Sequence, residues 1–180
     1  MTELISSYIT ALKNVHWQDI DKFELSSSVS LHWLLEKGSL SRRFAEKCEN
    51  LRVELLFNEI ITPTQVTTEE KELLSDTHCL LREVVLLGDD KEWIVGRTLI
   101  PEASLKEQPH NLLQQGSIPL GLTVFSVEDV SRDALQLGWV ELPNQRLIAR
   151  RSRLWMNKKP MLVAELFLPD SPVYVAETVR

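Results

Sequence analysis

The sequence has few of the features that mark a secreted or membrane-spanning protein. It contains only two cysteines, Cys48 and Cys79, and they lack CxxC spacing, so we expect buried, reduced thiols and no disulfide. No run approaches the roughly 20 apolar residues of a membrane span, and Glu3 stands where a signal peptide needs basic residues. These absences predict a cytoplasmic protein without stable membrane association.

Motifs for cofactors and metals are missing as well. There is no GxxxxGK(S/T), GxGxxG, GxSxG or HExxH pattern, and the four histidines are scattered without metal-ligand spacing. A catalytic triad needs only to meet in space, but nothing in the sequence singles one out. We therefore expect neither a metal ion nor a nucleotide cofactor.

Acidic residues outnumber basic ones, and the formal net charge is -6. Phosphate binding needs a dominant positive field, so we expect no nucleic-acid partner. Six basic residues nevertheless lie between Arg146 and Lys159, and no acidic residue follows until Glu165. This basic segment predicts either a solvated sheet face or a site for a small anion.

The apolar pattern divides the chain into a mainly helical part, residues 1–50, and a mainly sheet-forming part, residues 51–175. Ile5, Ile9 and Leu12 recur at helical spacing, and further helices are expected within 28–38 and from Ser39 onward. Strand-length segments rich in Val, Ile, Leu and aromatic residues occur at 51–61, 77–87, 92–101, 134–142, 146–156 and 161–169. Turn residues at 88–92 and 143–145 favour antiparallel hairpins. We expect one domain over residues 1–180, an α+β fold in which N-terminal helices pack over an antiparallel sheet of about six strands.

Two charged residues interrupt strands that are apolar on both faces. Glu165 shares one face with Val163 and Phe167, and Arg82 shares one with Leu80 and Val84. One interpretation is a buried ion pair, either between these two residues or with Glu83 and one of the arginines 150, 151 and 153. The other is a ligand pocket, in which arginine would fork a carboxylate and a desolvated glutamate would exchange protons. The pattern alone leaves both open.

Several segments, taken in order, resemble the chorismate pyruvate-lyase family. They are "LLREVVLL", "WIVGRTLIP", "IPLGLTVF" and "RRSRLW" followed by "KPMLVAELFLPDSPVY". The resemblance runs from about Leu31 to Tyr174 and is only loose over residues 1–30. It implies an α+β fold with a six-stranded antiparallel sheet. It also implies a cofactor-free lyase that converts chorismate to 4-hydroxybenzoate and pyruvate for ubiquinone synthesis.

The resemblance also implies roles for particular residues. Arg82 would hold the ring carboxylate, Glu165 would lie near the ring hydroxyl as acid or base, and the backbone of Leu120 would contact the ligand. Leu40 falls on a lid position where the family is expected to carry methionine, a departure that puts only lid packing in doubt. A second cation is needed for the enolpyruvyl carboxylate, and the candidates are Arg97, Arg151 and Arg153.

A closed pocket under the helices is expected, with slow product release as its consequence. The resemblance further suggests a monomer that passes its product transiently to a membrane prenyltransferase. The main alternative is a non-catalytic effector-binding module, because ligand-binding domains of bacterial transcription regulators resemble the same fold. Such a module would bind a small anion and leave it unchanged.

Overall fold

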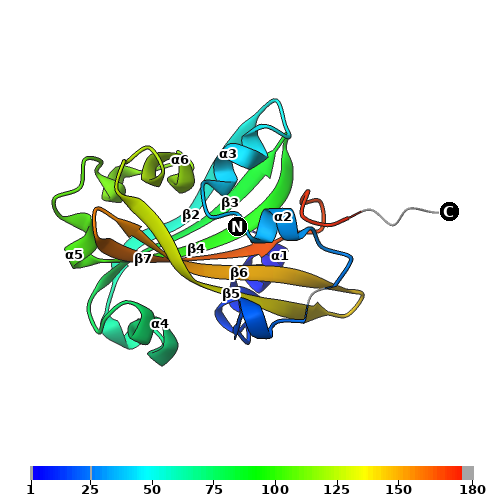
Figure 1. The fold of residues 1–180 in the computed structure, drawn as a ribbon, viewed down its shortest axis with the longest axis horizontal. Helices are drawn as coiled ribbons and strands as arrows, with labels where there is room; N and C mark the ends of the chain where they lie inside the picture. Colours follow the sequence, from blue (N-terminus) through cyan, green and yellow to red (C-terminus); the bar gives the residue numbers. More distant parts are fainter. Residues whose placement is uncertain (1, 25, 176–180) are drawn as a thin grey trace.

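Within residues 2–24 and 26–175, which the computed structural model describes, seven antiparallel strands form one sheet in the order β1-β5-β6-β7-β4-β3-β2 (Figure 1). The strands are β1 (Gln18–Asp19), β2 (Leu51–Ile61), β3 (Cys79–Gly88), β4 (Lys91–Pro101), β5 (Val130–Leu142), β6 (Gln145–Met156) and β7 (Lys159–Phe167). The six long strands match the six predicted segments, and the two-residue β1 is an addition. The predicted α+β class with an antiparallel sheet is confirmed.

Tight turns join β3 to β4, β5 to β6 and β6 to β7. Asp89 and Asp90 between β3 and β4, and Asn157 and Lys158 between β6 and β7, all adopt positive φ. Paired positive φ values give a turn the same twist as the strands that flank it. The last strand, β7, then pairs with both β4 and β6, which places it in the middle of the sheet.

Short helices connect and cover the strands. They are α1 (Glu3–Lys13), α2 (Leu31–Leu34), α3 (Leu40–Ala45), α4 (Thr68–Leu73), α5 (Glu102–Leu105) and α6 (Leu120–Val124), with 3-10 turns η1 (Ile20–Lys22), η2 (Pro63–Gln65) and η3 (Leu112–Gln114). None of the described residues forms a helix long and apolar enough to cross a membrane. The helix expected up to Gly38 ends at Leu34, because the carbonyls of Trp33, Leu34 and Glu36 accept hydrogen bonds from Arg150.

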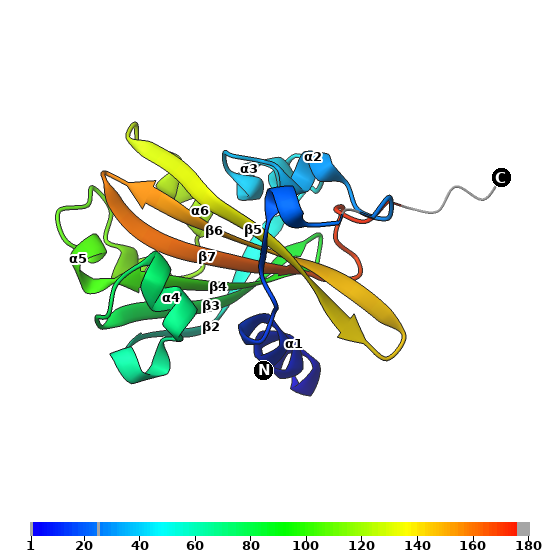
Figure 2. The same cartoon turned by 60° about the horizontal axis from the view of Figure 1, so that its bottom comes forward.

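The helices cover both faces of the sheet. On one face, the apolar stripe of α1 packs against Val85, Val95 and Leu166. On the other face, α2 and α3 pack through Phe44, whose ring stacks on Trp33 at 4.8 Å. Figure 2 shows α1 on one side of the sheet and α2 and α3 on the opposite side. The sheet therefore has two buried faces, and each can carry a site.

Candidate active site

A cavity of about 90 Å³ lies on the α3 face of the sheet, under α3 and α6. Its floor is formed by strands β3, β4 and β7, which alternate side chains toward it. Gly96 of β4 stands directly between Val84 of β3 and Glu165 of β7 in the register. Because glycine has no side chain, the floor is open at this point.

Arg82 lines this cavity from β3 and is 2% exposed. Its guanidinium donates to the carbonyl oxygens of Gly116 at 2.7 Å and Ile118 at 3.0 Å, in the loop that leads into α6. Burial lowers the pKa of Arg82. No carboxylate among the described residues forms an ion pair with it, so its remaining N–H groups can fork a ligand carboxylate.

Glu165 lines the same cavity from β7 and also forms an ion pair. Its Oε2 lies 3.3 Å from Nε of Arg150, which is fully buried on the neighbouring strand β6. The alignment of the two atoms is poor for a hydrogen bond, and neither has another hydrogen-bond partner. The two interpretations of the sequence are therefore compatible: Glu165 pairs with Arg150, not with Arg82, and still faces the cavity.

Leu40 and Leu120 line the cavity from the first turns of α3 and α6. The Ser39 hydroxyl caps α3 by accepting from the N–H of Arg42 at 3.1 Å. Helix α6 comes close to α3 because Gly121 has no side chain. A Cβ there would lie 3.0 Å from Oγ of Ser41 and 3.1 Å from Oγ of Ser39. The two helices together form the cover over the cavity.

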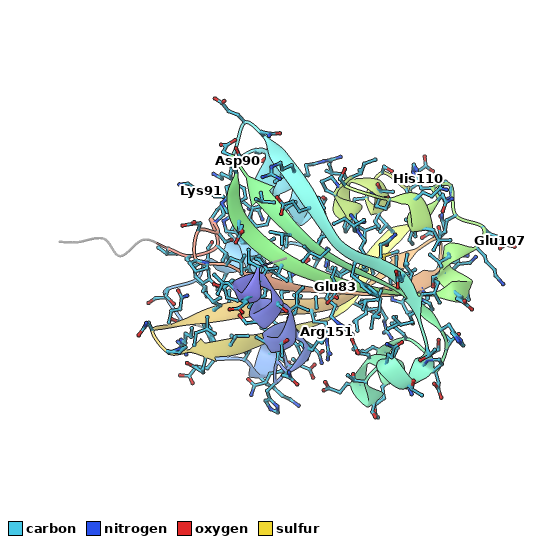
Figure 3. All side chains as sticks on the ribbon, turned by 180° about the vertical axis from the view of Figure 1, so that it is seen from behind. Glu83, Asp90, Lys91, Glu107, His110 and Arg151 are labelled. Atoms are coloured by element: carbon cyan, nitrogen blue, oxygen red, sulfur yellow. The ribbon has the colours of Figure 1, made fainter. Side chains whose placement is uncertain are left out.

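Arg97, Arg151 and Arg153 lie on the opposite face of the sheet, which corrects the expectation that one of them adds a second cation to this cavity. Arg97 pairs with Glu70 at 2.5 Å, Arg151 donates to Gln136, and Arg153 pairs with Asp133. Figure 3 views this face, with Arg151 beside α1. The reason is strand parity: Arg97 lies between Gly96 and Thr98, which both face the cavity.

Arg132 of β5 lines the cavity, although sequence reasoning missed it. Its guanidinium donates to the carbonyls of Lys37 at 3.2 Å and Gly38 at 3.1 Å and to the hydroxyl of Ser152. Burial and the neighbouring Arg150 lower the pKa of Arg132 to about 10, so it is a cation at neutral pH. Arg132 lies in the polar stretch "SRDA", where a charge has no apolar background to stand out against.

The fold and the cavity define an α+β protein whose cavity is lined by two arginines, Arg82 and Arg132, and one glutamate, Glu165. The chorismate lyase family profile matches residues 11–179, and the chain belongs to this family.

Relatives that carry the name chorismate pyruvate-lyase match nearly the whole chain. A probable chorismate pyruvate-lyase from Vibrio parahaemolyticus serotype O3:K6 is 56% identical over 179 residues, covering 99% of this chain and 100% of the relative. A chorismate pyruvate-lyase from Photorhabdus laumondii is 40% identical and covers 89% and 92% of the two chains. Among solved structures, PhnF from Mycobacterium smegmatis has a TM-score of 0.54 at 12% identity, covering 81% and 70%. At that identity the likeness shows the fold alone.

Proposed function

We propose that this protein is a chorismate pyruvate-lyase, which converts chorismate to 4-hydroxybenzoate and pyruvate without a cofactor. The observation that carries the proposal is the charge of the cavity. Arg82, Arg132 and Glu165 line it, and Arg150 pairs with Glu165 from the neighbouring strand β6. Three cations and one anion leave a net charge of about +2, which complements a dianionic substrate.

The reaction needs few protein groups because its product is aromatic. Chorismate is a cyclohexadiene with a carboxylate on C1, an enolpyruvyl ether on C3 and a hydroxyl on C4. When C4 loses its proton, the C–H electron pair forms the C3=C4 bond, and the C3–O pair leaves with the enolpyruvyl oxygen. That oxygen takes up a proton, and enolpyruvate becomes pyruvate. The protein must bind and orient chorismate and move protons.

We assign Glu165 as the base at C4. In its ion pair with Arg150 it is a carboxylate, which accepts protons and cannot donate them. Arg82 binds the ring carboxylate through the N–H groups that its loop partners leave free. Leu40 and Leu120 in the cover exclude water, which strengthens these contacts. Slow opening of the cover would then limit product release.

We further propose that residues 1–180 act as one domain and as a monomer in the cytoplasm. The 4-hydroxybenzoate would enter ubiquinone synthesis and pass transiently to a membrane prenyltransferase. Light scattering at micromolar protein concentration tests the monomer, and a mass near twice 20.7 kDa would contradict it.

The activity is tested with EDTA-treated protein and chorismate, by measuring 4-hydroxybenzoate and pyruvate chromatographically. We expect equal amounts of both products. Glu165→Gln should lower kcat at least about 100-fold, because it keeps the shape and removes the base. The matched control is Glu83→Gln. Glu83 is also a buried glutamate in a strand, but it follows Arg82, which faces the cavity, so the Glu83 side chain faces away from it. Chorismate that returned intact from the wild-type protein would refute the proposed function.

A further inference from the structure

The three charged residues of the cavity come from three different strands of the sheet. Arg82 is on β3, Glu165 on β7 and Arg132 on β5, and the strand order places β7 two strands from each of the others. Two strand spacings correspond to about 10 Å. In strand order the glutamate therefore lies between the two arginines. Along β7, Arg82 is level with Val163 and Arg132 with Met161, so both arginines are offset from Glu165 toward the start of that strand.

The Arg132 guanidinium keeps N–H groups free although it already donates several hydrogen bonds to the protein. Arginine has five N–H groups, and the contacts to Lys37, Gly38 and Ser152 use three of them. Its guanidinium also lies 5.6 Å from the ring centre of Phe125, which covers the cavity beside it. None of the described carboxylates forms an ion pair with Arg132. A cation without a counter-ion in a covered cavity fits a ligand anion.

We propose that Arg132 binds the carboxylate of the enolpyruvyl arm while Arg82 binds the ring carboxylate, so that the C3–C4 bond of chorismate lies at Glu165. This inference rests on the proposed function and identifies the second cation that a dianionic substrate requires. The two arginines then fix the direction of the substrate, because exchanging its ends would move C4 away from the base. Arg132 also stabilises the negative charge that departs with enolpyruvate.

The same contacts give Arg132 a link to the cover. Lys37 and Gly38 precede α3, so a carboxylate held by Arg132 also orders the segment that leads into the cover. An alternative role, in which Arg132 only holds this segment, would affect every ligand of the cavity equally. The proposed role affects only ligands that carry the second carboxylate.

Two non-reacting probes separate these roles by calorimetry. The first is 4-hydroxybenzoate, which has the ring carboxylate alone, and the second is 3-(carboxymethoxy)-4-hydroxybenzoate, which adds a carboxylate on an ether arm at the position of C3. Arg132→Gln should weaken the second probe roughly 10- to 150-fold, the range of a hydrogen-bonded charge pair, and change the first less than about twofold. Arg82→Ala should weaken both. The control Arg146→Gln, an exposed arginine stacked on Trp139, should change neither.

Equal weakening of both probes by Arg132→Gln would overturn the proposal, and so would no change in either. With chorismate we expect a raised KM, and Arg132→Lys, which keeps the charge and loses the fork, should recover part of it. If Arg132→Gln does not fold, Arg132→Lys carries the same comparison of the two probes. Turnover by the wild type tests the proposed function, whereas the ratio of the two probe affinities tests this inference. The two can therefore fail separately.

Discussion

Replacing Arg150 in the Arg150–Glu165 pair should destabilise the fold more than replacing Glu165. Arg150 is fully buried, and its Nη1 donates to the carbonyls of Trp33, Leu34 and Glu36, whereas Glu165 has a 12% exposed side chain. Removing one partner of a buried pair costs about 3–5 kcal/mol, so we expect Arg150→Met to lower the free energy of unfolding by about 4 kcal/mol. Glu165→Gln, which leaves Arg150 its carbonyl partners, should lower it by about 2 kcal/mol.

The double variant measures the pair itself. Once Arg150 is gone, changing Glu165 to glutamine removes an unpaired buried charge, so the double variant should lose about 4 kcal/mol rather than the sum of about 6. Guanidinium unfolding at pH 7, with equal slopes for the four proteins, gives the comparison. Costs that add to within about 0.5 kcal/mol would refute a direct interaction. If Arg150→Met does not fold, Arg150→Lys replaces it in the same cycle.

Three further predictions concern the cavity and its cover. Gly121→Ala should weaken 4-hydroxybenzoate binding several-fold by pushing the two cover helices apart, and adding Ser41→Ala, which removes the nearest oxygen, should restore part of it; binding that stays unchanged would contradict the close contact. Gly96→Ala should weaken the same ligand, because its Cβ would lie 3.2 Å from Cγ2 of Val84, and adding Val84→Ala should not recover the lost floor space near the base. Burial raises the pKa of Glu36, but hydrogen bonds from the Gly38 amide and from Arg43 lower it more, so the folded pKa is below the usual 4.5. The contribution of Glu36 to the free energy of unfolding is therefore complete above pH 4.5 and is lost as the pH falls through the lower folded pKa. Wild type should therefore exceed Glu36→Gln in unfolding free energy by about 1 kcal/mol at pH 7 and by less at pH 3; a constant difference would contradict the assignment.

Strand positions could be predicted because the buried sheet imposes an apolar pattern on the sequence. Arg82 and Glu165 stood out for the same reason, since each is a charge inside an apolar strand. Helix α4 was missed although Thr67 and Glu70 form a capping box that the spacing T-x-x-E announces. Its sequence, TEEKEL, has a single apolar residue, so it shows no apolar periodicity.

Arg132 could not be predicted from periodicity. The pairing of β5 with β6 shifts between Asp133 and Gln136, where Ala134 adopts a φ of 51°. This bulge changes which residues of β5 face the cavity, so alternation counted back from "ALQLGWVEL" does not reach Arg132. The bulge is set by pairing with β6, and a single strand's sequence does not contain that information.

The arginines of the basic segment 146–159 do not share one environment, because they lie on both faces of the sheet. Arg150 and Arg151 are adjacent in sequence and both buried, yet Arg150 turns toward Glu165 and Arg151 toward Gln136 on the other face. The same cluster therefore supplies a cation to each of two environments, and only parity along β6 decides which. The segment as a whole is therefore not a single anion site, because its arginines divide between the two faces. With parity counted from Glu165, whose register partner is Arg150, the cavity side has Arg150 and Ser152, and Arg132 completes it through the hydroxyl of Ser152.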